Sequence, residues 1–168
     1  MCGQDIEAPK DAKHHKNFNL EVFGAHFGTG VNFDMRFHKG RVDGLGFRVG
    51  IGGIPEGTIP LLYTRIRDFS LMSIPIEMNY VVGAKNHGLV AGLGILSSII
   101  QTSGDFPNVN NNPIEREGLS YTGIYTLFGY RYSSLKKGLH IQLHYNPIFT
   151  SELGRIEYFG LQIGIGFK

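Results

Sequence analysis

From Asn17 onward the chain alternates apolar and polar residues with a period of two, in eight separate runs. A period of two is typical of β-strands, because successive side chains point to opposite faces of a sheet. The sequence shows no convincing helix, so an all-β fold is predicted. Most runs are close to the roughly 9–11 residues that a tilted strand needs to cross a bilayer. The runs span residues 17–24, 31–37, 45–51, 72–82, 89–99, 121–132, 139–146 and 158–167.

The connections between the runs differ in length according to the end at which they fall. If consecutive strands are antiparallel neighbours, every second connection lies at the same end of the sheet. Tight connections follow the second, fourth and sixth runs, at 38–44, 83–88 and 133–138. The other end has a short connection at 25–30, long ones at 52–71 and 100–120, and a medium one at 148–157. We therefore predict one β domain, 17–168, preceded by a polar tail, 1–16.

The two faces of the predicted strands differ in chemistry. Within the runs, one face carries large apolar and aromatic residues and no Lys, Arg, Asp or Glu. A charge at such a position would cost roughly 2–4 kcal/mol at a bilayer midplane, so this face suits lipid contact. Eight strands enclose a space just wide enough for side chains, and the apolar set would overfill it. The apolar face is therefore predicted to be the outside of an eight-stranded antiparallel up-and-down transmembrane β-barrel.

The polar face is predicted to fill the inside of the barrel. Its nine glycines leave room for long neighbours; they are Gly46, Gly50, Gly92, Gly94, Gly123, Gly129, Gly160, Gly164 and Gly166. Three acids and three arginines stand between them and can neutralise one another. The predicted lumen charge network is Glu21, Asp34, Arg36, Arg48, Glu77, Arg131, His140, Gln142 and His144. Because an unpaired buried charge costs several kcal/mol, we interpret this network as a structural lock, with a gated ion path as the alternative.

Aromatic residues gather towards the ends of the runs. Near the tight connections stand Phe37, Tyr80, Tyr130 and Tyr132, and towards the other end stand Tyr145 and Phe159. Barrels that span membranes carry aromatic girdles at both interfaces. The aromatic positions therefore favour the same membrane-spanning arrangement.

Composition narrows the function classes. Charged residues make up only 18% of the 168 residues, and no apolar stretch is long enough for a spanning helix. The net charge of +2, without a clustered basic face, argues against a nucleic-acid-binding protein. The single cysteine, Cys2, rules out an internal disulfide and a cysteine-only metal site.

No motif for catalysis, a cofactor or a metal is found, so a non-enzyme without cofactor or metal is predicted. The Gly-x-Gly pairs at Gly92 and Gly164 lie within predicted strands, with no helix after them, and are not nucleotide loops. His140 and His144 are four residues apart along one strand, or about 13 Å, which is too far for one metal ion. Hydrogen bonding inside the lumen is the expected role of both histidines.

The stretch 19–37, with a glycine turn between two alternating strands, resembles the start of small outer-membrane β-barrel proteins of Bacteroidetes type. Segments 74–80 and 89–94, residues 129–132 and the final strand also match. The plan is similar to eight-stranded OmpX-type and OmpA-type barrels. This resemblance implies a porin-like integral protein of a Gram-negative outer membrane, with both termini in the periplasm. Such barrels usually end in an aromatic residue read by the barrel-insertion machinery; here Phe167 precedes Lys168.

The expected role is structural, or one of surface interaction through the external loops 52–71 and 100–120. The expected partners are outer-membrane lipid, lipopolysaccharide and, during assembly, the insertion machinery, and a monomer is expected. The candidate loop contacts are Tyr63, Arg65, Arg67, Phe69, Phe106 and Arg116.

Two alternatives stay open. One is a soluble, lipocalin-like barrel that binds a small apolar ligand, which predicts that Phe47 points inward and Arg48 outward. The other is a lipid-modifying outer-membrane enzyme, which predicts a His with a Ser or Glu partner at a rim.

Overall fold

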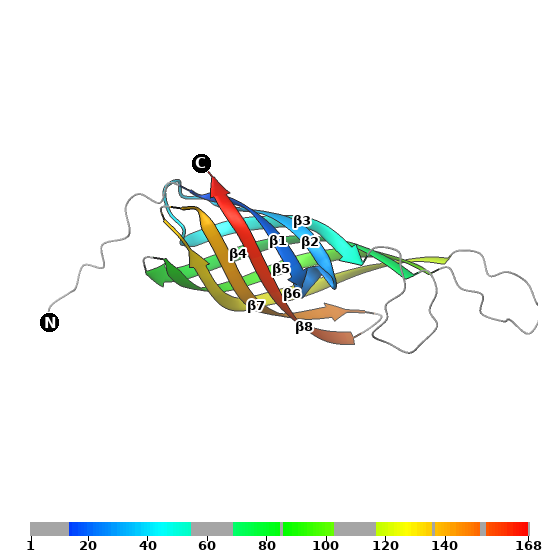
Figure 1. The fold of residues 1–168 in the computed structure, drawn as a ribbon. Coiled ribbons are helices and arrows are strands. Elements are labelled where there is room, and N and C mark those ends of the chain that lie inside the picture. Colours follow the sequence, from blue (N-terminus) through cyan, green and yellow to red (C-terminus); the bar gives the residue numbers. More distant parts are fainter. Residues whose placement is uncertain are drawn as a thin grey trace, which may run out of the picture.

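The computed structural model describes residues 14–54, 69–84, 86–102, 117–135, 137–151 and 154–167. In these residues eight strands form one closed antiparallel barrel (Figure 1), in which each strand pairs with the next and β1 closes on β8. The predicted eight-stranded up-and-down barrel is confirmed. The strands are β1 (Lys16–Phe23), β2 (Thr29–Arg36), β3 (Gly44–Ile54), β4 (Phe69–Ala84), β5 (His87–Thr102), β6 (Glu117–Ser133), β7 (Leu139–Thr150) and β8 (Gly154–Phe167).

The strands β4, β5 and β6 are much longer than the alternation predicted. They have 16, 16 and 17 residues, whereas β1 and β2 have 8 each. Polar residues such as Ser97 and Ser98 interrupt the apolar pattern, but the backbone ladder between β4 and β5 continues to the pair Phe69 and Thr102. The barrel wall is therefore taller on this side, and the ends of β5 and β6 reach farthest in Figure 1.

The two ends of the barrel are named here by their connections. The turn end carries residues 37–43, 85–86 and 134–138, and the loop end carries residues 24–28, 55–68, 103–116 and 151–153. Lys16 pairs with Phe167, so β1 begins and β8 ends at the turn end. The medium connection predicted at 148–157 is wrong: β7 and β8 pair as far as Thr150 and Gly154, which leaves three residues between them.

The first connection at the loop end folds into the barrel instead of forming the expected external loop. Gly24–His26 form a short 3-10 helix, η1, whose Ala25 and His26 are 0% exposed. Phe23 and Phe27, on either side, both have φ of 62°, a conformation that costs about 1–3 kcal/mol for a residue other than glycine. Hydrogen bonds inside the barrel, described below, offset this strain. No helix in the described residues is long and apolar enough to cross a bilayer.

Candidate functional site: the barrel lumen

The barrel is polar inside and apolar outside. Among the described residues, 18 polar or charged side chains are buried against 8 apolar ones, while 28 large apolar side chains are exposed. Arg48 and Glu77 are 0% and 1% exposed inside the lumen. Phe47 lies on the other face, paired with Met35 and with Met78, which is 54% exposed. This arrangement contradicts the soluble alternative and fits a hydrocarbon environment, because contiguous exposed apolar surface of this extent is rare on soluble monomers.

Aromatic side chains ring the outside near both ends. At the turn end Phe18 stacks on Phe167, with ring centroids 5.2 Å apart, and contacts the tilted ring of Phe33 at 5.5 Å. In the half nearer the loop end, the rings of Tyr145 and Phe159 are 5.1 Å apart.

Charges near the loop end of the outer face are paired. Arg155 forms an ion pair with Glu157 at 2.6 Å and donates a hydrogen bond to the Tyr145 hydroxyl at 3.2 Å. Both charged residues lie at the beginning of β8, before the apolar run predicted from the sequence. Charged and aromatic side chains thus mark the rim of the apolar band.

All nine residues of the predicted lumen charge network lie inside the barrel, each no more than 2% exposed. They come from six strands, because each occupies an inward position of its own alternating run. Pairwise contacts join eight of them into one ladder along the lumen, while His140 lies 3.2 Å from the Ser133 hydroxyl.

Asp34 of β2 organises the half of the ladder nearer the turn end. Its carboxylate accepts hydrogen bonds from Arg36 at 2.8 Å and from Arg131 of β6, across the lumen, at 3.0 Å. Arg36 also donates to the Asn79 amide oxygen at 2.5 Å, and Arg131 donates to Gln142 at 2.8 Å. One acid thus holds two arginines, and each arginine also donates to a neutral amide.

Arg48 of β3 occupies the middle of the lumen. Its guanidinium pairs with Glu77 at 2.6 Å and lies 3.7 Å from Glu21. Asn79 donates to the second Glu77 oxygen at 2.7 Å, which links this pair to the Asp34 group. Three arginines and three acids therefore balance one another within a single connected network.

Glu21 of β1 ties the network to η1 at the loop end. It accepts hydrogen bonds from Asn32 at 2.6 Å, from Gln162 at 2.8 Å and from the Ala25 backbone N–H at 3.2 Å. His144 lies 3.2 Å from the same carboxylate. A carboxylate with this many donors fixes both the strands and the inward-folded connection.

His26 is a lumen residue that the sequence analysis missed. Its ring lies 3.0 Å from the Asn32 amide oxygen and 3.2 Å from the Ser73 hydroxyl. It packs over glycines of β2 and β3: a methyl group on Gly30 would stand 2.4 Å from the ring, and one on Gly50 2.9 Å. The absence of a side chain at these two positions therefore creates the space that admits η1.

Other lumen members lie on the polar face but were not assigned to the network: Asn32, Ser73, Asn79 and Gln162. Their inward alternation was a usable signal for all four. No comparable signal marks His26, because it belongs to a connection with no period.

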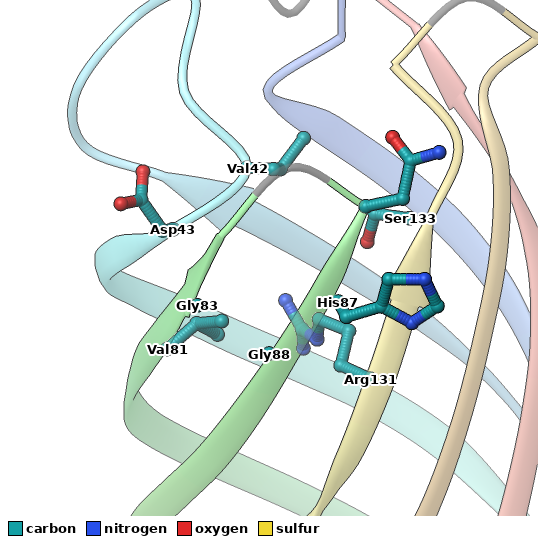
Figure 2. A pocket seen from close by; sticks show the side chains of 9 residues that line it. Val42, Asp43, Val81, Gly83, His87, Gly88, Arg131 and Ser133 are labelled. Carbon is teal, nitrogen blue, oxygen red and sulfur yellow. The ribbon is translucent and has the colours of Figure 1, made fainter. Parts of the chain in front are cut away.

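The described lumen is narrow at the turn end. The cavity there has a volume of about 10 Å³, room for roughly one water molecule. Figure 2 shows Asp43 and Ser133 on opposite sides of it, with Arg131 between them. Arg41 donates two hydrogen bonds to Asp43, at 2.8 and 2.7 Å, which lowers the pKa of that carboxyl group below its usual value.

The lipid-modifying alternative predicts a His with a Ser or Glu partner at a rim, and the two Ser–His pairs of the described residues are both enclosed. Ser73 lies 3.2 Å from His26, and Ser133 lies 3.2 Å from His140. Ser73 is 0% exposed, and the cavity beside Ser133 is the water-sized one. Neither hydroxyl has space for a substrate. In the described residues, no group of three His, Cys, Asp or Glu is placed to hold a metal ion.

Most of the predicted loop contacts fall outside the described residues. These are Tyr63, Arg65, Arg67, Phe106 and Arg116. Phe69 is the first residue of β4. The contact role of all six stays a prediction.

No family model and no curated protein matches the sequence. Solved structures do share the fold. The N-terminal β-barrel domain of Pseudomonas aeruginosa OprF superposes with a TM-score of 0.56 at 13% identity, covering 94% of this chain and 98% of that one. Neisserial surface protein A (NspA) superposes with a TM-score of 0.54 at 12% identity, covering 91% and 95%. The chain therefore has the fold of eight-stranded outer-membrane β-barrels.

Proposed function

We propose that the chain is an integral outer-membrane barrel whose lumen is a structural plug, and whose role is anchoring and surface interaction. The observation that carries this proposal is the ladder of paired charges across the lumen, from Asp34 to Glu21. A pore needs charges that face water, whereas these face one another and are almost fully buried. The apolar exterior and the shared fold support the location.

The absence of a conducting path is tested directly in a planar bilayer. Purified wild-type protein is expected to give no steady single-channel current, since paired and almost fully buried side chains occupy the described lumen. The double variant Arg48→Ala, Glu77→Ala empties the middle of the lumen and is the positive control, with brief current openings expected. A steady wild-type current that is lost in Arg48→Ala would show that the lumen is an ion path and not a plug.

The orientation proposed is that of outer-membrane barrels, with short turns in the periplasm and the loop end outside. Segments 55–68 and 103–116 join strands at the loop end, so they would face the surroundings and meet lipopolysaccharide or a partner. A Bacteroidetes-type origin and a monomeric state are parts of the same proposal.

Surface labelling of whole cells tests the orientation. An epitope inserted within 103–116 is expected to be labelled on intact cells. The matched insertion at Asn86, in the tight turn between β4 and β5, is expected to be labelled only after permeabilisation. The reverse labelling pattern would show that the loop end faces the periplasm. If deleting both 55–68 and 103–116 left every surface-binding phenotype intact, the interaction role would fall.

A further inference from the structure

A second cavity lies at the loop end, above the plug. Its volume is about 190 Å³, and it is partly open. Its walls come from strands on different sides of the barrel, with Leu71 of β4, Leu96 and Ser98 of β5, and Tyr158 of β8 among the lining residues. We call it the mouth cavity.

An apolar layer separates the mouth cavity from the charged lumen. Ala25, Leu96, Tyr125 and Ile148 form a buried apolar cluster, against which Phe27 and Tyr158 pack. The Phe27 and Tyr158 rings meet edge to face, with centroids 5.0 Å apart. The inward fold of η1 thus provides the floor of the cavity, because it places Ala25 and Phe27 there.

The size and lining of the mouth cavity suit a small apolar molecule. A cavity of about 150 Å³ lined by Leu, Ile and Phe stays dry and binds benzene, and the mouth cavity is somewhat larger. None of its described lining residues is charged, which disfavours an ionised ligand because nothing would pair with the charge.

Ser98 gives the cavity one specific polar feature. Its side chain is 4% exposed, lines the cavity, and its hydroxyl has no hydrogen-bond partner in the described chain. A buried hydroxyl without a partner costs about 1–3 kcal/mol, and a ligand atom that pairs with it recovers this cost.

We propose that the mouth cavity binds a small neutral amphiphile: an apolar body of one ring or a short alkyl chain, with a single oxygen that hydrogen-bonds to Ser98. Binding here does not depend on whether the lumen conducts, because the apolar layer lies between the two. A failed binding experiment and a failed conductance experiment therefore point to different errors.

The test uses two fluorinated probes of similar shape, 4-fluorophenol and 4-fluorotoluene, with the full chain in lipid nanodiscs. Binding is followed by ¹⁹F NMR, with empty nanodiscs subtracted to remove partitioning into lipid. Wild-type protein is expected to bind 4-fluorophenol saturably and more tightly than 4-fluorotoluene.

Two variants at one position separate the hydrogen bond from the space. Ser98→Ala keeps the cavity and is expected to weaken 4-fluorophenol binding about fivefold to tenfold, leaving 4-fluorotoluene unchanged. Ser98→Leu fills the cavity and is expected to abolish both signals. Circular dichroism and gel mobility confirm that each variant is folded.

Two outcomes overturn the proposal. One is a wild-type signal no larger than that of Ser98→Leu, which would mean that the cavity is already filled by lipid or by the chain itself. The other is equal 4-fluorophenol affinity for wild type and Ser98→Ala, which would remove the assigned ligand chemistry.

Discussion

Replacing Asp34 by asparagine is expected to lower the free energy of unfolding by about 3–5 kcal/mol, the usual cost of breaking a buried ion pair from one side. Asparagine keeps the shape of the side chain but removes the negative charge. Arg36 and Arg131, which lie 2.8 and 3.0 Å from the Asp34 carboxylate, would then repel each other in an enclosed lumen. Since the chain has no tryptophan, urea unfolding in detergent is best followed by β-sheet circular dichroism and by gel mobility without heating.

Two controls make the Asp34 result specific. Asp43→Asn removes a carboxylate that also pairs with an arginine, at 2.7 Å, but the Arg41 side chain is 42% exposed, so only a small loss is expected. Adding Arg131→Met to Asp34→Asn removes one of the uncompensated charges and is expected to restore part of the stability. Equal losses for Asp34→Asn and Asp43→Asn would show that the lumen charges are hydrated and that the barrel is not plugged.

Placing an arginine at Ile95 is expected to destabilise the membrane-inserted barrel by roughly 2–4 kcal/mol, the cost of a cation near the bilayer midplane. Ile95 is 58% exposed on the outer face, and its partners in the neighbouring strands, Ile76 and Ile124, are exposed and apolar too. The measurement is a urea titration of protein folded into phosphatidylcholine vesicles.

Ile99→Arg is the matched control, on the same strand and the same face but four residues nearer the loop end. There the cost is expected to fall to about 0–1 kcal/mol, because the guanidinium reaches the interface. Ile99 is 41% exposed, so both substitutions begin from a similar side chain in a similar setting. If both arginines were tolerated equally, the outer face would not be surrounded by hydrocarbon.

The strand content and the direction of each side chain could be predicted from the sequence. The run from Met72 to Val82 alternates strictly, and its residues alternate between exposed and buried in the structure. A strand has a period of two, so the chemistry of the two faces decides which one meets lipid once the sheet closes. The charge balance of the inward face could also be predicted, because three acids and three arginines occupy its alternating positions.

The length of the strands could not be predicted in the same way. Beyond the predicted run, which ended near Ile99, β5 continues to Thr102 because β4 and β6 supply its hydrogen-bond partners. Backbone pairing leaves no mark on the side-chain period. The last connection was placed wrongly for the same reason.

The sequence alone was enough to predict an eight-stranded barrel with an apolar outside and a polar inside whose charges balance, because every run alternates and no apolar face carries a charge. Which charges meet depends on how the barrel closes: Asp34 and Arg131 are 97 residues apart and touch because the curvature of the wall brings β2 opposite β6. The tertiary structure also decided that η1 folds inward, since the space for His26 is left by Gly30 and Gly50 on two other strands. A pattern along the chain records which way a side chain points, whereas contacts across a lumen depend on how the sheet closes.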